Sequence, residues 1–290
     1  MAESLVLDPG DENRSGLRGQ VFEILKTVLQ ADTEPPPLRT IIDLQRLIQP
    51  TPGYPSQPPL TLGREFFLPF HAVAWQIPYE GPLQGRIIRI LGALKNEYAV
   101  QKVEDGIVSF VWEAQHCLDE AFAETYDSIV YTTVPDLSVD EDIARRVNFH
   151  SYAARLMGAG LLGVDKYCIY AFADALEGQF SERSEPEHVE AATMVLDVEV
   201  RVAIVTEWIR HAAKAIYRRD FSVWGSIHGP LITWDEQGFS ANRWSLWKSR
   251  LSMVEMNALL SEDIRVRAGQ AVQTMNEVEA AAPNKTGQGF

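Results

Sequence analysis

Apolar side chains recur every three or four positions through residues 239–279, which is the spacing of one face of an α-helix. The spacing forms two stripes: Trp244, Trp247, Leu251, Val254 and Ala258, then Ile264, Ala268, Ala271, Met275 and Val278. Ser240 and Ser261 stand where helix N-caps are expected, and Glu262 and Asp263 suit the positive end of a second helix dipole. The pattern predicts two helices joined by a short turn into an antiparallel hairpin.

Similar periodicity predicts helices over most of the remaining chain. The predicted ranges are 17–31, 38–48, 60–77, 83–94, 113–125, 139–162, 165–176 and 186–218. The segments 107–112 and 129–134 are rich in β-favouring residues, so the sequence leaves open whether they are short strands or irregular pieces. The fold class predicted is all-α, a multi-helix bundle with a C-terminal helical hairpin.

Proline marks a division near the N-terminus. The segment from Pro50 to Pro59 cannot continue a helix and is interpreted as an extended connector. We therefore expect a disordered N-terminus at 1–16, and helices followed by the connector at 17–59. A main helical domain at 60–279 and a disordered tail at 280–290 should follow.

Composition narrows the possible partners. The 290 residues carry a formal net charge of -14, and 46% of them are hydrophobic. A nucleic-acid partner and an anionic membrane surface are therefore not expected, because both select clustered Lys and Arg. The two cysteines, Cys117 and Cys168, form no CxxC motif, which fits a reducing compartment. Without a basic leader or an apolar run of roughly 20 residues, the expected location is the cytoplasm.

The glycines at 158, 160 and 163 have the spacing of a dinucleotide-binding fingerprint. That motif needs a preceding strand, so that backbone amides at the following helix N-terminus meet a pyrophosphate. The residues before Gly158 instead have a helical pattern. We interpret the glycines as sites of close helix packing and as a helix C-cap.

Two Glu-x-x-His pairs, Glu113/His116 and Glu185/His188, have a spacing found in carboxylate di-iron bundles. Glu185 precedes the expected helix start, where its side chain should face water. Partner glutamates on apolar helix faces are not evident either. The sequence therefore predicts no metal site, no cofactor and no catalytic residue.

Three polar residues share one face of the helix predicted over 139–162. Asn148, Tyr152 and Arg155 are spaced by four and three, so they could bind a carboxylate or another polar ligand, with Arg155 as a bidentate donor. The alternative is that they tie this helix to its neighbours. Arg243 and Arg250, on the tryptophan-bearing helix, are expected to pair with acidic neighbours.

Several segments together resemble a fungal domain-of-unknown-function family, number 3632. They are Trp75–Pro78, Leu91–Leu94, Val147–Leu156, Ala175–Glu177, Glu207–Ile209 and Phe239–Leu251. The most specific part is the run that contains Arg243, Trp244, Trp247 and Arg250, which we take as a structural signature. The resemblance covers roughly residues 64–278. It departs from the family before Asn148, where the family often has Trp and this chain has Arg146 and Val147.

The resemblance implies an all-helical, intracellular fungal protein with no established activity to transfer. It also implies an association with fungal secondary metabolism, since some family members accompany gene clusters for azaphilone-type polyketide pigments. The leading hypothesis is a non-catalytic accessory or interaction protein. The alternative is an enzyme or small-molecule binder with a pocket near Asn148, Tyr152 and Arg155. The sequence identifies neither the protein or small-molecule partner nor the oligomeric state.

Overall fold

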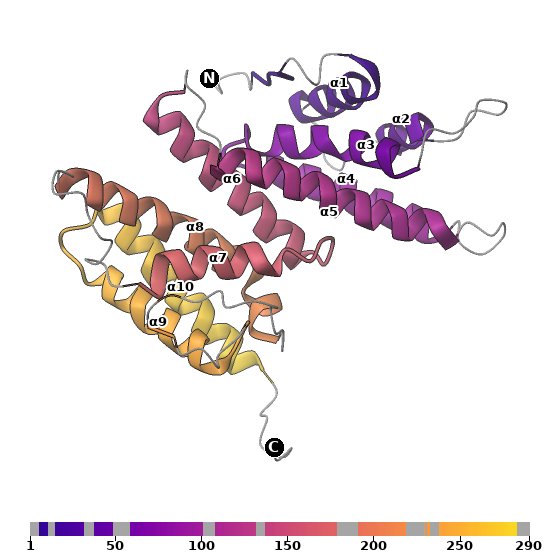
Figure 1. The fold of residues 1–290 in the computed structure, drawn as a ribbon. Helices are drawn as coiled ribbons and strands as arrows, with labels where there is room; N and C mark the ends of the chain where they lie inside the picture. Colours follow the sequence, from indigo (N-terminus) through magenta and orange to yellow (C-terminus); the bar gives the residue numbers. More distant parts are fainter. Residues whose placement is uncertain are drawn as a thin grey trace. The chain divides into compact units, whose positions relative to one another are not determined.

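The computed structural model describes residues 6–10, 15–31, 38–48, 59–100, 108–131, 137–178, 191–218, 229, 231–232 and 238–282. These ranges contain ten α-helices and no strand (Figure 1). In chain order they are α1 (Gly16–Gln30), α2 (Leu38–Ile48), α3 (Pro59–Ala74), α4 (Leu83–Val100), α5 (Val108–Tyr131), α6 (Val139–Gly158), α7 (Asp165–Leu176), α8 (Ala191–Arg218), α9 (Ala241–Glu255) and α10 (Glu262–Ala281). The predicted all-α fold class is confirmed.

Helix α5 replaces the two β-like segments. The described parts of those segments, 108–112 and 129–131, lie inside one helix, so they are neither strands nor irregular pieces, the two alternatives left open by the sequence. The reason is burial at helical spacing. Leu118, Phe122, Tyr126 and Ile129 follow one another at intervals of four, four and three, and each is at most 6% exposed. Packing of that stripe outweighs the local β preference of its ends.

Helix α6 ends at Gly158, four residues before the predicted end at Leu162. Gly160, just beyond it, has a φ of 65°. Glycine adopts this left-handed conformation without the steric penalty of a β-carbon, and it is common just after a helix. The C-cap interpretation is therefore confirmed for Gly160, and the helix stops earlier than its hydrophobic pattern suggests.

The helices form two compact units. The first comprises residues 1–152 and 159–163, and the second comprises 153–158 and 164–290, so α6 contributes residues to both. The domain boundaries expected from the sequence stay predictions. Among the described helices, none combines the length and apolar character needed to cross a bilayer.

In the first unit, α3 packs most extensively on α5 and also on α1 (Figure 1). The core of this unit is aromatic: Phe122 and Phe149 stack with ring centroids 5.0 Å apart, and Phe66 and Phe70 are fully buried. Asp8 joins this unit through two backbone hydrogen bonds, since its N–H donates to Gln76 Oε1 and its carbonyl accepts from Gln76 Nε2, both at 2.8 Å.

In the second unit, α10 packs on α8 and α9, and α7 packs on the same two helices. Ser240 caps α9, because its Oγ accepts from the Arg243 N–H at 3.0 Å. Near the start of α9, Trp244 Nε1 and Lys248 Nζ donate to Glu279, at the end of α10, at 2.8 and 2.6 Å. These contacts confirm the antiparallel hairpin.

Candidate functional site

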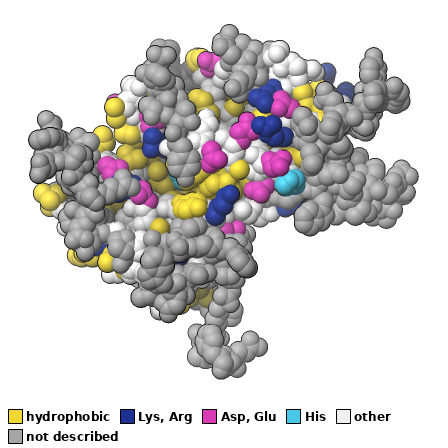
Figure 2. All heavy atoms as spheres, in the orientation of Figure 1, with side chains coloured by type: hydrophobic (Ala, Val, Ile, Leu, Met, Phe, Trp, Pro, Cys, Tyr) yellow, Lys and Arg dark blue, Asp and Glu magenta, His cyan; other side chains and the backbone are white. Residues whose placement is uncertain are grey.

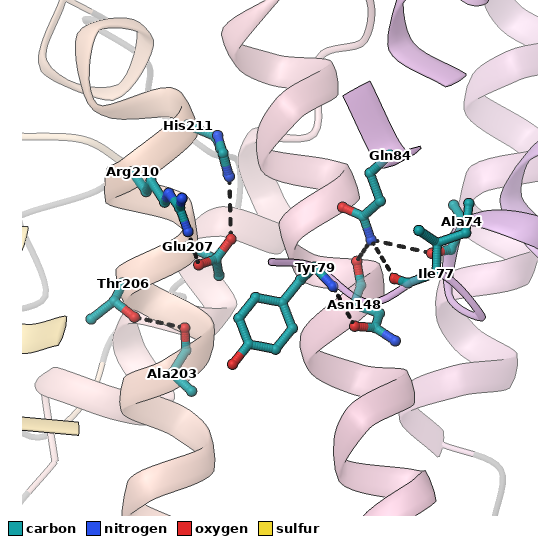
Figure 3. Close-up of polar contacts among 10 residues, drawn as sticks. All are labelled: Ala74, Ile77, Tyr79, Gln84, Asn148, Ala203, Thr206, Glu207, Arg210 and His211. Carbon is teal, nitrogen blue, oxygen red and sulfur yellow. Dashed lines mark hydrogen bonds and ion pairs between the residues drawn. The ribbon is translucent and has the colours of Figure 1, made fainter. Parts of the chain in front are cut away.

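Asn148 forms hydrogen bonds with both ends of its side-chain amide within the first unit, and Figure 3 shows the one from the Tyr79 N–H. Its Oδ1 accepts from the Tyr79 N–H and its Nδ2 donates to the Trp75 carbonyl, both at 2.9 Å. The backbone carbonyl of Asn148 accepts from Gln84 Nε2 at 2.8 Å. Asn148 therefore fastens the turn between α3 and α4 to α6, which is what a structural tie requires.

Tyr152 is fully buried one turn further along α6. Its hydroxyl lies 3.1 Å from Nδ1 of His71, which is also fully buried. Burial lowers the pKa of His71 to about 3, against a smaller opposite effect of the Leu118 backbone. Burial also raises the pKa of Tyr152. The pair is therefore a neutral imidazole beside a protonated phenol at neutral pH, inside the aromatic core.

Arg155 lies in the second unit, where it interacts electrostatically with Glu207 of α8. Glu207 is 2% exposed, and its carboxylate lies 3.5 Å from Arg210 Nη1 and 3.2 Å from His211 Nε2 (Figure 3). Burial lowers the pKa of Arg155, and the charge of Glu207 opposes that shift. Burial likewise lowers the pKa of His211, while its hydrogen bond to Glu207 acts in the opposite direction. Together, Arg155, Glu207, Arg210 and His211 form what we call the α8 charge cluster.

The three polar residues of α6 thus contact different groups. Asn148 and Tyr152 bind partners of the first unit, and Arg155 belongs to a charge cluster of the second. These contacts supply the ties that the structural alternative needs. A ligand role for the three residues stays a prediction.

A groove lies beside the α8 charge cluster. It is lined by Gly158, by residues 209–215 of α8, and by Thr274, Glu277, Val278 and Ala281 of α10, with a cavity volume of about 380 Å³. Gly158 brings α6 against α8, since a β-carbon at this position would lie 2.0 Å from the His211 carbonyl oxygen. The close-packing interpretation of Gly158 is confirmed, and the helix that precedes it is not the context of a dinucleotide site.

A buried carboxylate in the second unit has hydrogen-bond donors on both of its oxygens. Glu177, just after α7, accepts from Arg243 Nε and Nη2, from Trp247 Nε1 and from the Gly229 N–H, at 2.8–2.9 Å. The expected acidic partner of Arg243 is therefore found. Arg250 instead donates to the Gly178 carbonyl at 2.8 Å. We interpret Glu177 as a structural centre, because its acceptors already have donors.

The remaining candidates from the sequence are the two Glu-x-x-His pairs and the two cysteines. His116 is exposed and lies 3.1 Å from Glu120, while the Glu113 side chain, Glu185 and His188 fall outside the described residues. Cys117 and Cys168 are buried, and neither forms a disulfide. Within the part of the chain that is described, no group of three or more His, Cys, Asp or Glu residues could hold a metal ion.

Exposed apolar side chains gather where α9 turns into α10. Met253, Met256 and Leu259 are 49%, 76% and 81% exposed. We call these three residues the hairpin tip. The sequence pattern does not reveal this surface, because exposure depends on what neighbouring elements leave uncovered.

Comparison with known proteins gives a family and no further relative. Neither the curated proteins nor the solved structures include a match to the chain. The model of the family "Protein of unknown function (DUF3632)" matches residues 69–251. That range includes Asn148, Glu177, Glu207 and residues 241–251 of the tryptophan-bearing helix α9. The chain belongs to the DUF3632 family.

Proposed function

We propose that this protein is a non-catalytic helical accessory protein that binds another protein through the hairpin tip. The observation that carries the proposal is the exposure of three large apolar side chains within seven residues. Burying such a side chain against a partner contributes about 1.5–3 kcal/mol. Methionine adapts its unbranched side chain to a partner's surface, and it is enriched at helix-binding surfaces.

Charge indicates the kind of partner. Residues 252–263 contain Glu255, Glu262 and Asp263, all exposed, and no Lys or Arg. Asp263 pairs with Arg267 at 2.7 Å, which leaves the other two carboxylates for a partner. The whole chain is acidic as well, with a net charge of -14. An amphipathic helix with one apolar face and basic flanks complements this surface, and such helices commonly bind apolar grooves and patches.

The proposal extends to a pathway through the family resemblance. We place the partner among the proteins of a fungal polyketide-pigment pathway, which the protein would assist without catalysing a step. Deleting the gene in the source organism and profiling its metabolites tests this part. Returning the gene with the hairpin-tip residues replaced should give the same pigment profile as the deletion strain. An unchanged profile after deletion would rule out a role in the pathway, and docking would then be tested by itself.

Docking is tested with a synthetic amphipathic helix built only from leucine and lysine. Fluorescence titration should show saturable binding, and the combined Met253→Gln, Met256→Gln and Leu259→Gln variant should bind at least about tenfold more weakly. None of these substitutions changes the net charge. Equal affinity of the variant and the unaltered protein would contradict the proposal.

Two controls separate docking from other effects. Val139→Gln replaces an apolar residue that is 67% exposed in the first unit and should leave peptide affinity unchanged. A peptide of leucine and glutamate should bind far more weakly than the lysine peptide, because its charge repels the exposed acids. The alternative occupant is a second copy of this chain. Sedimentation showing a dimer that the tip variant converts to a monomer would assign the tip to self-association and overturn the proposal.

A second candidate function is the enzyme or small-molecule binder considered above, with Asn148, Tyr152 and Arg155 as its residues. The contacts of Asn148 and Tyr152 favour a structural role for both. The observation that favours small-molecule binding is the groove on α8, which involves different side chains.

A further inference from the structure

The groove between α8 and α10 has an apolar floor. Helices α8 and α10 run in the same direction, because Glu199, near the start of α8, accepts from the Ser261 N–H at 2.6 Å and the groove lies along their later turns. Ile209, Ala212 and Val278 line it and are buried. The small alanine side chains and Gly158 leave a cavity of about 380 Å³, which falls within the range of small-molecule sites, roughly 300–1,000 Å³.

Cations stand on one wall of this groove. Arg210 and Lys214, one helical turn apart on α8, are both exposed lining residues. Lys214 forms no ion pair with any residue that the structure describes. Arg210 makes a long contact of 3.5 Å with Glu207, and its side chain is 57% exposed. Both side chains can therefore turn toward a ligand.

The acidic residues near the groove are already engaged. Glu207 is buried among Arg155, Arg210 and His211. Glu277, on the α10 wall, accepts from Gln273 Nε2 at 3.0 Å. Three cationic side chains, Arg155, Arg210 and Lys214, thus face two carboxylates, which leaves a positive excess beside an apolar floor. That combination suits a molecule with an apolar or aromatic body and one negative charge.

We propose that the α8–α10 groove binds an amphipathic organic anion, namely an aromatic or alkyl carboxylic acid. The apolar body would lie on Ile209, Ala212 and Val278, and the carboxylate would accept hydrogen bonds from Arg210 and Lys214. Thr274 lines the α10 wall. This ligand site goes beyond docking at the hairpin tip and does not depend on it.

The probe for this site is 8-anilinonaphthalene-1-sulfonate, an aromatic anion whose fluorescence rises on transfer from water to an apolar site. N-phenyl-1-naphthylamine has the same ring system without the sulfonate. Titration should show saturable binding of the anion and an affinity for the neutral analogue about five- to tenfold lower, the range for two exposed charge contacts. Equal affinities for the two probes would overturn the proposal, and so would no saturable binding of either.

Variants locate the binding. Arg210→Gln combined with Lys214→Gln should lower the affinity for the anion about five- to tenfold and leave that for the neutral probe unchanged. Thr274→Met, which narrows the groove without changing its charge, should weaken the binding of both probes. Lys166→Gln removes an exposed cation from α7 and should change neither affinity. Retention of full anion affinity by both groove variants would contradict the proposal.

One further variant distinguishes the groove from the hairpin tip. The combined Met253→Gln, Met256→Gln and Leu259→Gln variant should keep the unaltered affinity for the sulfonate probe. Loss of probe binding in this variant would place the probe at the tip and overturn the assignment to the groove. That result would leave the peptide-docking experiment to be judged by its own outcome.

Discussion

The guanidinium of Arg243 and the carboxylate of Glu177 form a bidentate ion pair with both side chains fully removed from solvent. Nε lies 2.8 Å from Oε1 and Nη2 lies 2.8 Å from Oε2, although the two residues are 66 positions apart in the chain. Trp247 and Gly229 donate to the same carboxylate. This pair joins the end of α7 to α9, the first helix of the α9–α10 hairpin.

Glu177→Gln should strongly destabilise the second unit. The substitution keeps the shape of the side chain but leaves the Arg243 cation buried without its counter-charge, a loss of about 3–5 kcal/mol. Urea unfolding followed by tryptophan fluorescence measures it. Glu124→Gln is the matched control, because its partner Arg64 and Glu124 itself are 38% and 40% exposed. That change should stay within about 1 kcal/mol, and similar losses in the two variants would refute the assigned role of Glu177.

Gly158→Ala should destabilise the packing of α6 on α8. The added β-carbon would lie 2.0 Å from the His211 carbonyl oxygen, so the helices must move apart. Overpacking of this kind costs about 1–3 kcal/mol. Gly92→Ala in α4 is the control, since its β-carbon would meet nothing within 4 Å. That substitution within a helix should stabilise the protein by about 0.5–1 kcal/mol. The two variants should therefore shift the melting temperature in opposite directions.

The tryptophans of α9 should be core residues. Trp247 is fully buried with its ring 4.3 Å from that of Phe172, and Trp244 is 4% exposed. Replacing each with alanine removes about 3–5 kcal/mol, so the double variant should unfold the second unit in circular dichroism. A folded double variant that loses a binding partner would show that these rings form an interface.

Stability should fall as pH decreases from 7 to 5, because the first unit buries neutral histidines. Burial lowers the pKa of His71 to about 3 and, together with the charge of Arg146, that of His150 to about 4, from an unfolded value of 6.5. Below pH 6.5 the unfolded chain therefore takes up protons that the folded chain does not. The two residues together should lower the free energy of unfolding by about 3–4 kcal/mol over this interval.

Urea unfolding at a series of pH values checks this dependence. His71→Leu should reduce the slope of stability against pH by roughly half of that contribution. His116→Gln alters an exposed histidine, 53% accessible beside Glu120, and should leave the slope unchanged. A slope that is the same in the unaltered protein and in His71→Leu would contradict a neutral buried imidazole at position 71.

Helices could be predicted where one apolar stripe and one clear boundary coincide. The ends of α2 and α7 were predicted at the observed residues, and the α9–α10 hairpin followed from its stripes and from Ser240. Helix α5 could not be separated from strands locally, because Ile129 and its neighbours favour β-structure until burial of the whole stripe is taken into account. The end of α6 was misplaced because apolar residues continue past Gly158.

Contacts at the candidate sites depend on distant segments, which local patterns do not reveal. The sequence identified Asn148 and Arg155 as polar residues on one face, yet Trp75 and Tyr79 as partners of Asn148 lie about seventy residues away. Glu177 and Glu207 appeared only within the family resemblance, with no partner assigned. The hairpin tip and the α8–α10 groove arise from what the packed helices leave open, so only the structure locates them.

Docking at the hairpin tip can be followed residue by residue through the methyl resonances of the methionines. Met253 and Met256 belong to the tip, whereas Met157 and Met275 are 1% and 0% exposed and serve as internal controls. The protein is labelled with carbon-13 at the methionine methyl groups, assigned by Met→Leu substitutions, and titrated with the leucine–lysine helix. On the space-filling face of Figure 2, acidic and basic side chains lie side by side among the described residues, so charge alone offers the peptide several places to bind. If the peptide docks at the tip, the Met253 and Met256 resonances should shift saturably, and those of Met157 and Met275 should not move. Saturable peptide binding that leaves the Met253 and Met256 resonances in place would contradict docking at the tip.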